Sequence, residues 1–150
     1  ALYRLFANIE DLLGEVAAEC RRSFAHSLRL GVEGVQEPRD RARQMCRTYL
    51  EYAVDHPSHY DLMFARNAPL SSHARAFEAG EVSFNLLIDL AQSTGALPAE
   101  VTAFHVWSQL HGTVELLKHL ALPAGLGERR DEIVERTIDG CIASLGLESP

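Results

Sequence analysis

Apolar residues recur at steps of three and four along nearly the whole chain, and this periodicity restricts the fold more than any other feature. Steps of three and four place side chains on one face of an α-helix, whereas a half-buried strand needs strict alternation of apolar and polar residues. Such alternation is hard to find even over short stretches. The sequence therefore predicts a chain of helices, each of which buries an apolar stripe.

The first predicted helix is the most clearly marked. Asn8 is a favourable N-cap, and Glu10 and Asp11 follow in the first turn, where the helix dipole favours anions. Gly31 interrupts the pattern, so this helix is expected to run from about residue 8 to 30. Its apolar stripe consists of Ile9, Leu12, Leu13, Val16, Ala17, Cys20, Phe24 and Leu28.

Proline and glycine divide the remaining chain into further helical segments with short connections. Pro38 and Pro98 are well placed as first helical residues, and Pro57 separates two helices. We expect helices at about 38–55, 58–64, 98–120 and 128–145, and one from a cap at Ser71 or Ser72 to about residue 93. The predicted fold class is therefore all-α, a single helical bundle of about six helices.

The predicted helix at 98–120 carries two apolar faces. One face holds Phe104, Trp107, His111 and Val114, and the other holds Val106, Leu110, Thr113 and Leu117. A helix that is apolar on two sides is expected to lie between neighbours on both sides.

Composition excludes several classes of protein. The net charge of −7 does not favour neutralisation of nucleic-acid phosphates, so this chain alone is not expected to hold DNA or RNA. The three cysteines are widely spaced, which is typical of a reducing compartment rather than a disulfide framework. The sequence has no apolar run long enough to span a membrane and no order of segments typical of a signal peptide. We therefore expect a cytoplasmic protein.

Motifs for catalysis or metal binding are absent from the sequence. It contains no nucleophile elbow, zinc-protease motif or phosphate-binding loop. His111, Glu115 and His119 are spaced four apart, but the two histidines would lie about 12 Å apart along a helix. One metal ion, with ligands at about 2 Å, cannot reach both. We expect no metal, no cofactor and no catalytic residue.

Large or half-polar side chains are unusually numerous on the predicted inward faces. They are Phe24, Tyr49, Tyr60, Met63, Phe64, Phe84, Trp107 and His111, from five predicted helices. Cys20 and Leu87 share the stripes of Phe24 and Phe84 and complete the set of candidate ligand contacts. These residues could fill a solid core, or they could line a cavity in which aromatic rings give shape and Tyr, Trp and His orient a ligand. Residue type and spacing leave both interpretations open.

Three segments together resemble the TetR family of bacterial transcriptional regulators. ALYRLFANIEDLL (1–13) is similar to the junction between the recognition helix of the family's helix-turn-helix and the long connecting helix. TYLEYAVDHPSHYDLMF (48–64) resembles a helix–Pro–helix stretch of the ligand domains. WSQLHG (107–112) matches the Trp-x-x-x-His-Gly element of one subgroup. Their order and spacing cover nearly the whole chain.

The resemblance implies a domain organisation and a function. Residues 1–7 would be the end of the helix-turn-helix, whose remainder would precede Ala1, and residues 8–150 would be the ligand-binding and dimerisation domain. Tyr3 matches a position that often contacts a DNA phosphate. The resemblance also implies a homodimer through the helices at 98–120 and 128–145, which would use their second apolar faces.

The expected function is that of the effector-sensing part of a transcriptional repressor. A mostly apolar small molecule would pack on Phe24, Phe84 and Trp107, bond to His111 or a tyrosine hydroxyl, and shift the connecting helix. The DNA-binding heads, supplied by the N-terminal domain, would then release operator DNA.

Three alternatives come from different classes of protein. The first is a helical homodimer with a filled core that acts through protein partners. The second is an enzyme with His111 and Glu115 as an acid–base pair. The third is a redox sensor that uses Cys20, Cys46 or Cys141.

Overall fold

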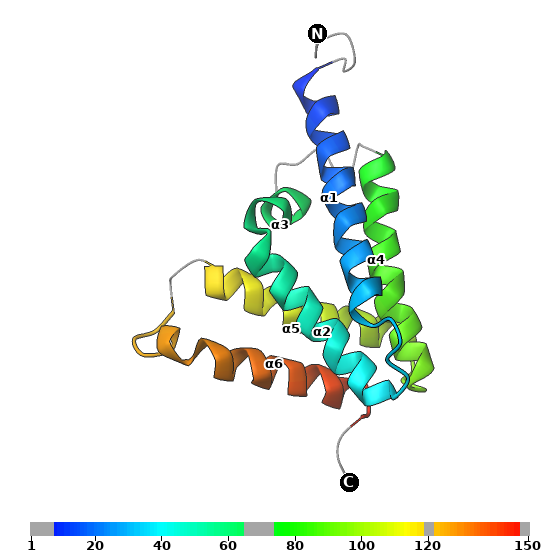
Figure 1. Ribbon diagram of the computed structural model, residues 1–150, viewed down its shortest axis with the longest axis vertical. Coiled ribbons are helices and arrows are strands. Elements are labelled where there is room, and N and C mark those ends of the chain that lie inside the picture. Colours follow the sequence, from blue (N-terminus) through cyan, green and yellow to red (C-terminus); the bar gives the residue numbers. More distant parts are fainter. Residues whose placement is uncertain (1–7, 65–73, 119–121, 148–150) are drawn as a thin grey trace.

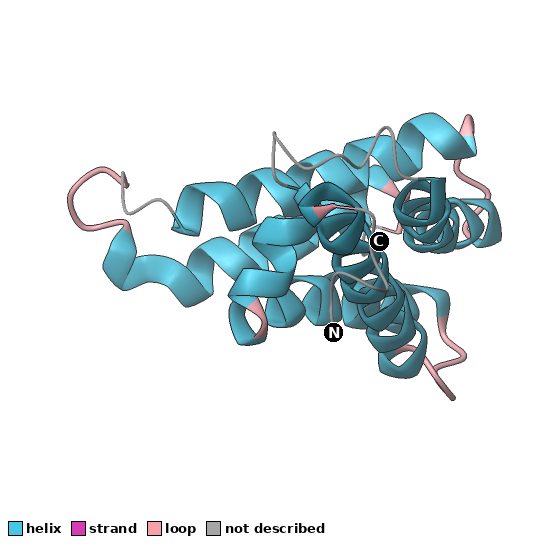
Figure 2. Ribbon diagram, turned by 90° about the horizontal axis from the view of Figure 1, so that it is seen from above, coloured by secondary structure: helices cyan, strands magenta, loops and turns pink. Residues whose placement is uncertain are grey.

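A computed structural model describes residues 8–64, 74–118 and 122–147 of the chain. These residues form six α-helices and one 3₁₀ turn, and they contain no strand (Figure 2). The helices are α1 (Ile9–Gly31), α2 (Pro38–Asp55), α3 (Pro57–Phe64), α4 (Ala74–Ser93), α5 (Ala99–Lys118) and α6 (Arg130–Ser144). The predicted all-α fold is confirmed. The expected caps at Ser71 and Ser72, and the DNA contact at Tyr3, lie outside the described residues.

Local chemistry explains where α1 begins and how closely it approaches its neighbour. The side chain of Asn8 accepts a hydrogen bond from the Asp11 backbone N–H at 2.8 Å, which satisfies one of the free donors at the helix start. Gly31 forms the last turn and lies against Thr48 of α2. A Cβ at position 31 would overlap the Thr48 hydroxyl, so glycine allows α1 and α2 to meet closely.

The helices are arranged as two crossing groups. The long helices α1 and α4 run side by side, and α5 and α6 run together across the base of the molecule, with α2 packed against both groups (Figure 1). The short helix α3 continues from the end of α2 and contacts α1.

The core is built from the stripes that periodicity indicated. Leu28, Tyr49, Tyr60, Met63, Leu110 and Ile138 are among its largest fully buried side chains. No helix in the described ranges is both long enough and apolar enough to cross a membrane.

The expectation for the second face of α5 requires a correction. Val106 and Leu110 are 1% and 0% exposed, because they pack against other helices of the same chain. They are therefore not available to a second copy. The outward face of α5 instead carries Ser108 and Leu116, which are exposed, and Gly112 between them.

Candidate ligand pocket

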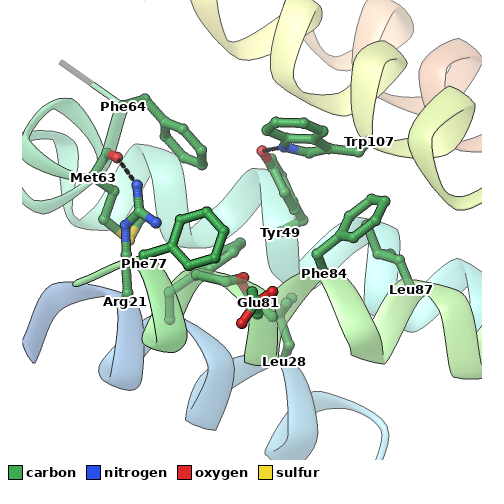
Figure 3. A pocket seen from close by; sticks show the side chains of 13 residues that line it. Arg21, Leu28, Tyr49, Met63, Phe64, Phe77, Glu81, Phe84, Leu87 and Trp107 are labelled. Carbon is green, nitrogen blue, oxygen red and sulfur yellow. Dashed lines mark hydrogen bonds between the residues drawn. The ribbon is translucent and has the colours of Figure 1, made fainter. Parts of the chain in front are cut away.

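A pocket of about 380 Å³ lies between α1, α2, α3, α4 and α5. This volume is at the lower end of the range for small-molecule sites. Its wall consists of Arg21, Phe24, Leu28, Tyr49, Met63, Phe64, Phe77, Gly80, Glu81, Ser83, Phe84, Leu87 and Trp107. Figure 3 shows Arg21 and Met63 at one side of the pocket and Phe84 and Leu87 at the other. The wall is mostly aromatic and aliphatic, so the pocket suits an apolar molecule.

Burial distinguishes the floor of the pocket from its rim. Phe24 and Leu28 of α1 are 3% and 1% exposed and belong to the floor. Phe77, on the first half of α4, is 56% exposed, and Glu81 one turn later is exposed as well. The opening of the pocket is therefore bordered by α4.

Four side chains form a continuous hydrogen-bond chain from the pocket wall into the protein. Trp107 Nε1 donates to Tyr49 Oη at 3.2 Å, Tyr49 Oη lies 2.9 Å from Tyr60 Oη, and Tyr60 Oη lies 2.7 Å from His111 Nδ1. An indole N–H can only donate, so Tyr49 accepts from Trp107. Both tyrosine hydroxyl protons in this hydrogen-bond chain have an acceptor if Tyr49 donates to Tyr60 and Tyr60 donates to His111. The geometry thus favours a neutral His111 with its proton on Nε2.

Burial keeps all these groups in their neutral forms. It raises the pKa of the Tyr49 hydroxyl and that of the Tyr60 hydroxyl, where the neighbouring Tyr49 adds to the effect. Burial also lowers the pKa of the His111 imidazole, against the opposing influence of the Glu115 carboxylate. A neutral imidazole is the form whose Nδ1 can accept a hydrogen bond from the Tyr60 hydroxyl.

Acidification is therefore expected to destabilise the fold through His111. Because the folded state disfavours the imidazolium, the unfolded chain binds this proton more readily. The contribution of His111 is fully present above its ordinary pKa of 6.5 and is lost as pH falls below that value towards the lowered pKa. In His111→Asn the Oδ1 of the new side chain can accept the hydrogen bond from Tyr60 but does not titrate. The stability of this variant should therefore depend less on pH in the acidic range. Melting temperatures of the parent protein and of His111→Asn, measured from about pH 8 to pH 5, test this prediction. Parallel pH dependences of the two proteins would contradict it.

Arg21 connects α1 to the two helices on either side of the pocket opening. Its Nη2 donates to the Met63 carbonyl at 2.7 Å, and its Nη1 donates to the Ala76 carbonyl at 3.1 Å. Gly80 provides the room, because a Cβ there would overlap the Arg21 guanidinium. The Nε of Arg21 is buried and has no hydrogen-bond partner among the described residues.

The structure brings together most of the side chains that sequence reasoning singled out. Seven of them line the pocket: Phe24, Tyr49, Met63, Phe64, Phe84, Leu87 and Trp107. Tyr60 and His111 are not part of the wall but reach it through the hydrogen-bond chain, and Cys20 is buried on α1 outside the wall. Ligand contact by any of these residues stays a prediction.

Sequence reasoning missed six lining residues: Arg21, Leu28, Phe77, Gly80, Glu81 and Ser83. Phe77 and Gly80 share the stripe of Phe84 and Leu87 on one predicted helix, so the helical period could have indicated them. Arg21 and Glu81 carry no apolar signal, and only the packing of α1 against α4 reveals their place at the pocket.

The cysteines are free and buried. Burial raises the pKa of the Cys20 thiol, and a hydrogen bond with Cys141 together with burial raises that of the Cys46 thiol. Both effects lower the thiolate fraction, which is the reactive form, so the redox alternative is disfavoured. Within the described ranges, no group of three or more His, Cys, Asp or Glu side chains is placed to hold a metal ion.

The geometry defines an all-helical domain whose long first helix forms one wall of an apolar pocket. A family model described as "Tetracyclin repressor-like, C-terminal domain" matches residues 42–141 of the chain. The chain therefore belongs to the family of tetracycline repressor-like C-terminal domains, in agreement with the resemblance of its sequence. Membership of the Trp-x-x-x-His-Gly subgroup stays a prediction.

A solved structure has the same fold. It is described as "Structure of a protein with unknown function from Rhodococcus sp. RHA1", and it matches with a TM-score of 0.74 and 22% sequence identity. The match covers 96% of this chain and 77% of the other. At this identity the likeness establishes the fold alone. No curated protein matches the chain in sequence.

Proposed function

We propose that this chain is the effector-sensing and dimerisation part of a cytoplasmic transcriptional repressor, which releases DNA when a mostly apolar small molecule binds. The observation that carries the proposal is the position of α1, because Arg21, Phe24 and Leu28 of this helix belong to the pocket wall. In this proposal residues 1–7 end a helix-turn-helix and residues 8–150 form the sensing domain. A ligand would therefore touch the helix that connects to the DNA-binding head.

The mechanism requires a ligand that prefers one position of α1 to another. A ligand shifts a conformational equilibrium only by its difference in affinity for the two states, and a 100-fold loss of operator affinity needs about 2.7 kcal/mol. At about 25 cal/mol per Å² of apolar area, this equals about 110 Å² buried in only one of the two states. The ligand must therefore gain or lose apolar burial of this order when α1 moves, and Phe24 and Leu28 are the apolar residues of α1 in the wall.

The pocket distinguishes this proposal from the filled-core alternative. A homodimer that acted only through protein partners would need no ligand pocket, whereas this chain has a pocket of about 380 Å³ among aromatic side chains, open at α4. The pocket thus supports the small-molecule function.

Filling the pocket is expected to weaken ligand binding. Ser83 lines the pocket, so Ser83→Phe places a phenyl ring in the space that a ligand would occupy. Trp107, the sole tryptophan, also lines the pocket, so its fluorescence reports binding directly. With biphenyl-4-methanol as the probe, we expect Ser83→Phe to weaken binding at least about 10-fold.

Asn85→Phe is the matched control, because Asn85 lies on the same helix but is exposed and is not part of the wall. It should bind the probe like the parent protein. Equal binding by Ser83→Phe and the parent would refute the pocket as the ligand site. Native mass spectrometry of the freshly purified protein adds an independent observation, since a carried-over organic adduct would give the mass of the natural ligand.

A further inference from the structure

The guanidinium of Arg21 is a charge without a carboxylate partner. Of its five N–H groups, two donate to the backbone carbonyls of Met63 and Ala76. Arg21 has no carboxylate within ion-pair distance among the described residues, and unlike Arg41, which also donates only to backbone carbonyls, it belongs to the pocket wall. The neighbouring segment 65–73 contains no Asp or Glu in its sequence.

We propose that the ligand of this pocket is an amphipathic carboxylate, with its apolar body among the aromatic side chains and its anionic head on Arg21. This inference rests on the proposed function and adds to it the chemical class of the effector. The pocket supplies both parts of such a site, because Phe24, Phe84 and Trp107 form an apolar wall and Arg21 belongs to the same wall.

The electrostatics of Arg21 favour an anion. Burial lowers the pKa of its guanidinium, and no nearby carboxylate opposes this effect, so the charge is held in a place where it is poorly solvated. A carboxylate would restore the lost stabilisation through charge-assisted hydrogen bonds to the planar donor fork. The Nη protons that do not bond to the Met63 and Ala76 carbonyls are donors of this kind.

Glu81 is the one acidic side chain in the pocket wall, and it favours the opposite charge. It is exposed, however, and a charge pair in contact with water contributes little. Arg21 is partly buried, so an ion pair between a ligand and Arg21 contributes more to the free energy of binding than one with Glu81. The net charge of −7 also repels anions at long range, so a preference for carboxylates must come from a local cation such as Arg21.

Three probes with one apolar body and different heads test the proposal: biphenyl-4-carboxylate, biphenyl-4-methanol and biphenyl-4-methylammonium. The fluorescence of Trp107 in the parent protein measures the affinity of the protein for each probe. We expect the carboxylate to bind about 10- to 100-fold more tightly than the alcohol, as a charge-assisted hydrogen bond implies. The ammonium probe should bind most weakly.

Arg21→Gln should remove the preference for the carboxylate and leave the affinity for the alcohol within about threefold. Arg22→Gln is the matched control. It removes the same charge from the next residue of α1, but Arg22 is exposed and pairs only with Glu19. This control should keep the full preference. Arg21→Lys, which retains the charge but not the planar fork, should keep part of it and provides a second variant if Arg21→Gln does not fold.

The possible failures point to different conclusions. If none of the three probes binds the parent protein, the pocket is not a ligand site and the proposed function falls. If the carboxylate and the alcohol bind equally, or Arg21→Gln keeps the preference, only the carboxylate proposal falls. Tightest binding of the ammonium probe would also overturn it and would make Glu81 the anchor.

Discussion

Tyr60→Phe is expected to lower the free energy of unfolding by about 2–3 kcal/mol, although it removes a single oxygen atom. That oxygen joins two partners, since Tyr49 Oη lies 2.9 Å away and His111 Nδ1 lies 2.7 Å away. Without it, the buried Tyr49 hydroxyl loses its acceptor and the His111 ring loses its donor. A buried polar group left unpaired costs about 1–3 kcal/mol, so two such groups produce a large effect.

Tyr52→Phe provides the matched control. Tyr52 is also buried, but its hydroxyl makes a longer bond of 3.4 Å to the Cys20 carbonyl, and its other hydrogen-bond partner is the side chain of Ser23, which is only partly buried. Its loss should cost about 1 kcal/mol or less. Urea unfolding measures the free energy of unfolding of both variants. The comparison is valid if the slope of this free energy against urea concentration is the same as in the parent protein. Equal losses for the two variants would show that the hydrogen-bond chain contributes no special stability.

A double mutant tests whether the hydrogen-bond chain acts as a unit. Tyr49→Phe alone leaves the Trp107 N–H without its acceptor and Tyr60 without its donor. Because the bond between the two tyrosines is lost in either single variant, the combined loss in Tyr49→Phe/Tyr60→Phe should be smaller than the sum. A strictly additive result would mean that the two hydroxyls do not interact.

The helices could be predicted from the sequence because the signals that define them are local. The cap at Asn8, the proline at the start of α2 and the spacing of apolar residues act within a few positions, so they predicted α1 and α2 closely. The start of α6 was predicted two residues early, because a 3₁₀ turn at Gly127–Arg129 precedes the helix. A single turn of this kind has no strong signal of its own in the sequence.

The pocket could be predicted only in part, because it depends on how the helices are rotated against one another. The helical stripes identified Phe24, Phe84 and Trp107 as inward-facing, and these residues meet in the pocket. The link between Tyr60 and His111 joins residues 51 positions apart, and no local pattern predicts it. Arg21 was missed because a charged residue beside an apolar stripe normally faces water, whereas here its guanidinium reaches backbone carbonyls of two other helices.

The same limitation explains the correction on α5. Two apolar faces on one helix show that both are covered, but they do not show whether the cover is the same chain or a second copy. In this fold Val106 and Leu110 are covered by the chain itself. The surface left for a partner carries the exposed Leu116 beside Gly112 of α5, where an added Cβ would meet nothing within 4 Å, whereas Gly140 of α6 lies against Gln109 of the same chain.

Gly112→Glu is expected to prevent dimerisation while leaving the folded chain intact. The proposed interface uses α5 and α6, which are joined within the chain by hydrogen bonds from Gln109 to Ser144 and between Thr113 and Thr137. A Cβ at position 112 would meet nothing within 4 Å in this chain, so a larger side chain fits in the isolated subunit. Glutamate also favours helix more than glycine does, by up to about 1 kcal/mol.

In a dimer the same change buries an unpaired carboxylate on each subunit. An uncompensated buried charge costs about 3–5 kcal/mol, so the dissociation constant should rise by at least about 100-fold. Analytical ultracentrifugation over a dilution series measures this dissociation constant. Val54→Glu, on the exposed face of α2, adds the same charge outside the proposed interface and should leave the dimer unchanged. A monomeric parent protein would contradict the proposed interface through α5 and α6, and a Gly112→Glu dimer of undiminished affinity would move the interface away from this face of α5.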